Sequence, residues 1–204
     1  MNKEEIFWNW FETNNSKYFY LNQIKDLVEK ENLLDQFLKQ LHNYCDKLYF
    51  EIGGFPNQPQ ELIISAEGNK NYFDKVEALV KAAPKINDWQ IIAFKPPMGV
   101  DFITEYGGVK LNVHEIWFLP LENADDPQAL GLRIYLPNYN PEQENVFIEG
   151  CYQVLDGILG EKTVTLDIQH VEVDKLPKKP EEKGLIELSE LQKYITWRKQ
   201  KLNK

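Results

Sequence analysis

The chain has 204 residues, 43% of them hydrophobic and 13% aromatic, which is an ordinary composition for a folded protein. Its formal net charge of −9 disfavours nucleic-acid binding, because phosphate contacts need clustered Lys and Arg side chains. No apolar stretch reaches the roughly 18 to 20 residues that cross a bilayer, and no basic region followed by an apolar run opens the chain. We therefore expect a cytoplasmic protein without a membrane partner, in which Cys45 and Cys151 are free, buried thiols.

The apolar pattern divides the chain into five segments. We expect an N-terminal helical segment, a first strand-strand-helix-strand (ββαβ) unit, a connector, a second ββαβ unit, and a linker with a C-terminal helix. In chain order they cover residues 1–47, 48–97, 98–110, 111–174 and 175–204.

The N-terminal segment shows helical spacing of its apolar residues. Ile6, Phe7, Trp10 and Phe11 recur every three to four residues and predict a short first helix. From about residue 17 to residue 47 the apolar positions describe one stripe. A polar run at 29–32 would break this stripe into two helices.

The first ββαβ unit begins with alternating residues at 48–52 and a turn from Gly53 to Pro59. Residues 61–66 are the predicted return strand, and a helix that ends at Pro84 follows. The almost wholly apolar run at 89–94 is typical of a central strand that is covered on both faces.

The connector at 98–110 is irregular and predicts either a short hairpin or a mobile loop. In the second unit, residues 111–119 and 130–136 are predicted strands. A predicted helix follows these strands, with Asn140 as its N-cap and Gly160 at its C-terminal end. Alternation at 164–168 predicts the third strand, which slips by one residue near His170.

The C-terminal segment begins with a charged linker at 174–184. Ser189 and Gln192 then form a predicted capping box before a terminal helix. Such a helix docks either on the body of the protein or on a partner.

A Pro-Gln pair precedes the second strand of each unit, at residues 59–60 and 127–128, so the two units read as an internal duplication. The predicted fold class is α+β, with a mixed, mostly antiparallel sheet, or two abutting sheets, and helices on one face. We expect one compact domain overall. The order of elements resembles a ferredoxin-like arrangement.

Three polar residues at the end of the last strand are candidates for chemistry. His170, Glu172 and Asp174 are spaced i, i+2 and i+4, which places them on one face of a strand. An imidazole and two carboxylates can hold a divalent ion or pair a general base with a carboxylate. The alternative is a polar strand end that runs into solvent.

Carboxylates in apolar surroundings form a second candidate set. Glu51 and Glu115 occupy equivalent first strands and would suit a two-carboxylate mechanism if the two units faced each other. Glu67 is a further carboxylate of this kind. No nucleophile motif and no phosphate-binding loop is present in the sequence, so we expect no cofactor and no metal.

Five tyrosines have less obvious core roles than the other aromatic residues, and Phe102 lies in the irregular connector: the tyrosines are Tyr18, Tyr49, Tyr106, Tyr135 and Tyr139. Such side chains suit a recognition surface, where Tyr serves as an amphipathic anchor. Of these, the candidate partner-binding residues are Phe102, Tyr106, Tyr135 and Tyr139.

The sequence favours a non-catalytic binding or regulatory module, for example an immunity-type protein that masks a basic partner. We expect a protein partner or a small ligand, no nucleic acid, and a monomer or homodimer. The alternative is a hydrolase or metal-assisted enzyme that uses His170, Glu172 and Asp174, or Glu51 with Glu115. A third hypothesis is a structural protein that self-associates.

Overall fold

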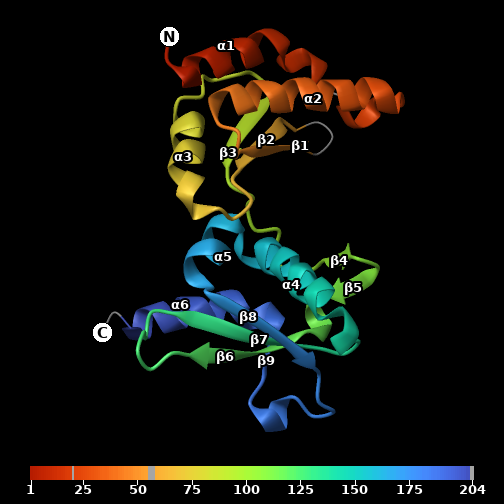
Figure 1. Ribbon diagram of the computed structural model, residues 1–204, viewed down its shortest axis with the longest axis vertical. Coiled ribbons are helices and arrows are strands. Elements are labelled where there is room, and N and C mark those ends of the chain that lie inside the picture. Colours follow the sequence, from red (N-terminus) through yellow and green to blue (C-terminus); the bar gives the residue numbers. More distant parts are fainter. Residues whose placement is uncertain (20, 55–57, 203–204) are drawn as a thin grey trace. The chain divides into compact units, whose positions relative to one another are not determined.

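A computed structural model describes residues 1–19, 21–54 and 58–202. The chain separates into two compact units, Met1–Lys95 (unit 1) and Pro96–Lys204 (unit 2). Both combine helices with mixed sheets, which confirms the α+β class (Figure 1). The expected turn between Gly53 and Pro59 lies partly outside the described residues. Tyr20, in the apolar stripe predicted for residues 17–47, lies outside them as well.

Unit 1 begins with two α-helices, α1 (Lys3–Asn14) and α2 (Leu27–Tyr44). The predicted start of the second helix near residue 17 is wrong, because two 3₁₀ turns, η1 (Asn15–Lys17) and η2 (Leu21–Gln23), precede it. Asp26 sets the true start by accepting hydrogen bonds from the backbone N–H groups of the first turn. The helix then continues through 29–32 without a break.

The first ββαβ unit is confirmed. Strand β1 (Tyr49–Gly53) pairs antiparallel with β2 (Gln60–Ser65), and β2 pairs parallel with β3 (Trp89–Ala93). The turn η3 (Lys70–Tyr72) and helix α3 (Phe73–Lys81) make the crossover. One face of this sheet joins the helices in an aromatic-rich core that includes Phe11, Phe37, Leu62 and Ile64.

Unit 2 begins with a hairpin, which settles the two alternatives for the connector. Strands β4 (Ile103–Tyr106) and β5 (Val109–Asn112) are joined at Gly107 and Gly108, both of which have positive φ angles. The predicted strand at 111–119 is interrupted by η4 (Val113–Glu115) and resumes as β6 (Trp117–Glu122).

The main sheet of unit 2 has the order β8-β7-β6-β9. β6 pairs antiparallel with β7 (Leu130–Leu136), and β7 pairs parallel with β8 (His170–Lys175), the same pattern as in unit 1. The two-residue strand β9 (Ile186–Glu187) lies beside the start of β6. Within the described residues the strands therefore form three sheets, more than the one sheet or two abutting sheets expected from the sequence.

Between β7 and β8 the chain forms η5 (Pro141–Gln143), α4 (Glu144–Leu159) and α5 (Glu161–Asp167). The strand predicted at 164–168 is wrong. Val164 and Ile168 are four residues apart and are both buried, which suits a helix as well as a strand, and the N–H of Ile168 donates to the carbonyl of Val164. Gly160, with φ of +79°, separates the two helices.

The predicted linker contains the 3₁₀ turn η6 (Glu181–Lys183), and the chain then passes through η7 (Leu188–Glu190) into α6 (Leu191–Leu202). Leu191 and Ile195 of α6 are buried in the core of unit 2, so the terminal helix docks on its own unit. Within the part of the chain that the structure describes, none of the helices is long and apolar enough to pass through a membrane.

Both cysteines are free thiols, as predicted. Cys151 is buried in α4, where loss of hydration raises its pKa to about 12. Cys45 follows α2 and is only partly buried, so the expectation of full burial fails there.

Candidate functional site

The sheet of unit 2 has two unlike faces. Phe118, Leu132, Ile134, Val171 and Val173 point towards the helices and belong to the core. Successive strand residues point to opposite sides, so the intervening residues form a second face, which we call the outer face. It comprises Trp117, Leu119, Leu121, Arg133, Tyr135, His170, Glu172, Asp174 and Glu187.

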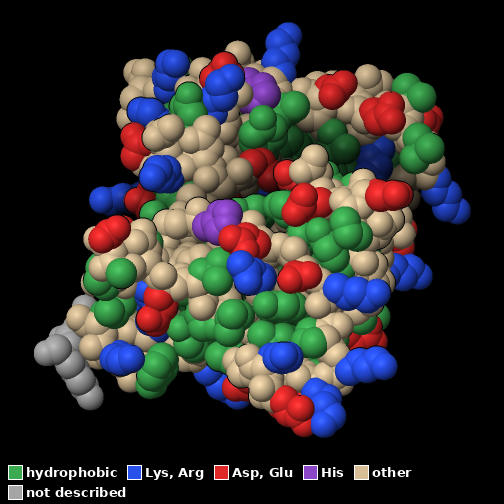
Figure 2. All heavy atoms as spheres, turned by 60° about the horizontal axis from the view of Figure 1, so that its bottom comes forward, with side chains coloured by type: hydrophobic (Ala, Val, Ile, Leu, Met, Phe, Trp, Pro, Cys, Tyr) green, Lys and Arg blue, Asp and Glu red, His purple; other side chains and the backbone are tan. Residues whose placement is uncertain are grey.

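The outer face is partly accessible. None of its apolar side chains belongs to the core cluster of unit 2. Trp117, Leu119 and Leu121 are each partly exposed. Figure 2 shows hydrophobic side chains gathered beside a histidine and charged groups on the side that this view brings forward. The segment between β8 and β9 extends from the sheet on the side away from α4 (Figure 1).

A polar network occupies one part of the outer face. Arg133 Nε donates to Glu172 Oε2 at 2.7 Å, and His170 Nε2 lies 3.1 Å from Glu172 Oε1. The hydrogen bond from Arg133, followed by that from His170, lowers the pKa of the Glu172 carboxyl. Glu172 is therefore an ion-pair centre, and each of its oxygens already has a partner.

The predicted grouping of His170, Glu172 and Asp174 on one strand face follows from their positions in β8. Asp174, however, accepts a hydrogen bond from the backbone N–H of Lys175 at 2.7 Å and does not join the network. Among the described residues, no group of three or more His, Cys, Asp and Glu side chains could hold a metal ion. No local sequence signal marks Arg133, because only the register of β7 with β8 places it opposite Glu172.

A second part of the outer face combines aromatic rings with carboxylates. The register aligns Glu187, Trp117, Tyr135 and Asp174 in one row across all four strands, which we call the aromatic–acidic row. Trp117 and Tyr135 are partly exposed, while the two carboxylates at the ends are exposed. Neither carboxylate forms an ion pair within the described part of the chain. Rings flanked by carboxylates attract cations.

The other predicted aromatic residues have packing contacts. Phe102 and Tyr106, at the hairpin, lie against α4, where Gly157 and Gly150 leave space for them. A Cβ atom at Gly157 would collide with the Phe102 ring. Tyr139 meets Phe147 edge to face, with 5.3 Å between ring centroids. Of the four predicted residues, Tyr135 is the one on the outer face.

Unit 1 contains a second charged cluster. Lys95 Nζ lies 2.9 Å from Glu67 Oε1 and 3.3 Å from Glu51 Oε1, just beyond the end of β3. Burial lowers the pKa of Lys95, but the hydrogen bonds and charges of Glu67 and Glu51 outweigh it, so the net pKa is raised. Glu67 has φ of +48°, a backbone conformation that costs energy for a residue other than Gly.

The predicted pair of Glu51 and Glu115 is divided between the two units. Glu51 has Lys95 as its partner, whereas Glu115 accepts a hydrogen bond from Asn112 Nδ2 at 3.3 Å. Glu115 belongs to a 3₁₀ turn and not to the predicted strand, so its position is not equivalent to that of Glu51.

No family model, curated protein or solved structure matches the chain.

Proposed function

We propose that the chain is a non-catalytic protein-binding module whose outer face contacts a partner with exposed Lys or Arg side chains. The aromatic–acidic row is the observation that supports this proposal, because its rings lie between two carboxylates without cationic partners in the described structure. A cation over an exposed ring gains about 0.5 to 1 kcal/mol, and a neighbouring carboxylate adds a charge-assisted hydrogen bond.

The surroundings of the row suit the same partner. Leu119 and Leu121 add partly exposed apolar area beside it, which matches the common combination of an apolar centre and a charged rim in interfaces. The net charge of −9 favours rapid encounter with a basic protein.

The polar network supports binding over catalysis. The hydrogen bonds from Arg133 and His170 lower the pKa of the Glu172 carboxyl, which makes Glu172 a weaker general base. The network links β7 to β8 through side chains at the centre of the sheet face, and such linked side chains favour a pre-organised contact surface.

The proposed module is cytoplasmic, is monomeric or homodimeric, and does not bind nucleic acid. Its two units arose by internal duplication. Masking of a basic partner in the manner of an immunity protein is the specific form that we favour. A small ligand on the same surface and self-association are the competing forms.

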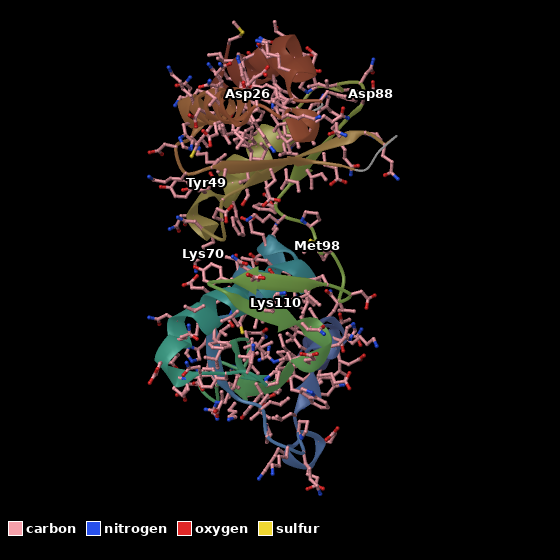
Figure 3. The ribbon with its side chains drawn as sticks, turned by 90° about the vertical axis from the view of Figure 1, so that its right-hand side faces the viewer. Asp26, Tyr49, Lys70, Asp88, Met98 and Lys110 are labelled. Carbon is pink, nitrogen blue, oxygen red and sulfur yellow. The ribbon has the colours of Figure 1, made fainter. Side chains whose placement is uncertain are left out.

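A random peptide library displayed on phage, panned against the full chain, tests the proposal. We expect the selected peptides to combine Lys or Arg with apolar residues. Trp117→Ala and Asp174→Asn should each weaken their binding by about tenfold, which corresponds to 1.4 kcal/mol. The matched controls are Tyr49→Ala, at an exposed position of β1 labelled in Figure 3, and Glu190→Gln, and both should bind as the unchanged chain does.

Several results would overturn the proposal. These are failure to select any peptide, selection of acidic peptides, and unchanged binding by the Trp117 and Asp174 variants. Sedimentation equilibrium addresses self-association. A dimer that Leu119→Asp abolishes would assign the outer face to a second copy of the chain.

A further inference from the structure

We infer that unit 2 has a second binding site, a cavity beside Arg198 that takes a small organic anion with a flat ring. The site uses none of the outer-face residues, so it does not depend on the proposed function. It lies between α6 and the segment that joins β6 to β7.

Arg198 is a buried cation held by neutral groups. The residue is 8% exposed, and its guanidinium donates three hydrogen bonds to backbone carbonyl oxygens. Nη2 donates to Pro127 at 2.6 Å and to Ala129 at 2.8 Å, and Nη1 donates to Gln128 at 3.2 Å. These bonds fix the position of the guanidinium and anchor the turn before β7.

The carbonyl groups that Arg198 contacts carry no net charge. Within the described ranges of the chain, no carboxylate lies at ion-pair distance from Arg198. The chain has two arginines, and the other, Arg133, is paired with Glu172 although it is more exposed. A buried charge without a charged partner is costly, so an anion bound beside Arg198 would gain more than it would at the surface.

Cavities of about 300 Å³ and about 170 Å³ adjoin Arg198. The larger reaches the lower limit of ordinary small-molecule sites. Among the described residues its wall carries two cations, Arg198 and Lys201, and one carboxylate, Glu122, so cationic charge predominates there. Neutral parts of the wall come from Pro127 and Trp197.

The exposed indole of Trp197 is the reason why we expect the ligand to contain a flat ring. Its side chain is 52% exposed at the cavity although it is among the largest apolar groups. The indole lies 5.7 Å from Tyr194 between ring centroids, and Lys201 Nζ lies 5.2 Å from the indole centroid. A planar ligand packed against the indole would bring an attached carboxylate within reach of both cations.

NMR spectroscopy of the ¹⁵N-labelled full chain tests this inference. The probes are benzoate and indole-3-acetate, with benzamide, indole-3-acetamide and inorganic phosphate as comparison compounds. We expect saturable shifts of the Arg198 Nε and Trp197 Nε1 signals with the two carboxylates, at a Kd of about 1 mM or tighter. The Arg133 Nε signal is the internal reference and should stay unchanged.

Variants at exposed positions preserve the fold and keep the test decisive. Lys201→Ala and Trp197→Leu should each weaken carboxylate binding by about fivefold to tenfold, while Lys193→Ala on the same helix should have no effect. Circular dichroism of each variant checks that the helical content of the chain is unchanged.

Lack of saturation with both carboxylates would overturn the inference. Equal binding of the neutral amides would exclude charge recognition, and equal binding of phosphate would exclude ring recognition. Unchanged affinity in the Lys201 and Trp197 variants would remove the site from this cavity.

Discussion

Units 1 and 2 each place an antiparallel strand and a parallel strand on either side of a central strand, with a helical crossover. They differ in how they neutralise charge outside the core. In unit 1, Lys95 pairs with both Glu51 and Glu67. In unit 2, Glu172 is paired, but Asp174 and Glu187 have no cationic partner in the described structure. The same strand arrangement can therefore carry a neutralised charge cluster in unit 1 and, in unit 2, a surface whose carboxylates can still attract a cationic partner.

Gly157 of α4 in unit 2 lies directly against the Phe102 ring, whereas Gly53 of β1 in unit 1 has no close neighbour. Gly157→Val should therefore have the largest effect on the free energy of unfolding. The new side chain would collide with Phe102, and overpacking of this kind costs about 1 to 3 kcal/mol. Urea unfolding measures the free energy of unfolding. Gly53→Val in β1 is the control, because a Cβ atom there meets nothing within 4 Å. Equal stability of the two variants would show that the hairpin does not pack against α4 as described.

Lys95→Met tests the neutralised cluster of unit 1 and should lower the free energy of unfolding by about 1 kcal/mol near neutral pH. Folding raises the pKa of Lys95, so its stabilisation is complete below its ordinary pKa and disappears as pH rises through the folded value. As pH rises into the alkaline range, the free energy of unfolding should therefore fall less in the Lys95→Met variant than in the unchanged chain.

Lys75→Met is the matched control, because Lys75 lies 3.9 Å from Asp74 at the surface and is 53% exposed. A loss in this control as large as in Lys95→Met would contradict a specific role for the cluster.

Glu172→Gln should have the smallest effect, below about 1 kcal/mol, because the Arg133–Glu172 pair is partly exposed to solvent. Folding lowers the pKa of Glu172, so its stabilisation is present above the ordinary value and is lost as pH falls through the folded value. Carbon-13 NMR of the side-chain carboxyl should give a Glu172 midpoint below the ordinary value of a glutamate. A midpoint at or above that ordinary value would mean that the network does not form in solution.

Local patterns predicted much of each unit. Alternation and turn residues located the first two strands of unit 1, and the Asn140 cap with the Gly160 stop bounded the helical segment that contains α4. Short apolar runs misled the prediction where two periods fit the same residues, as at Val164 and Ile168.

The sequence by itself determined the class of fold and the order of most elements, because hydrophobic periodicity and capping act over a few residues. It also placed His170, Glu172 and Asp174 on one strand face. Only the tertiary structure decided that Arg133 meets Glu172 and that Trp117 and Tyr135 share a row. Strand register joins residues far apart in the chain, and no local pattern contains that information.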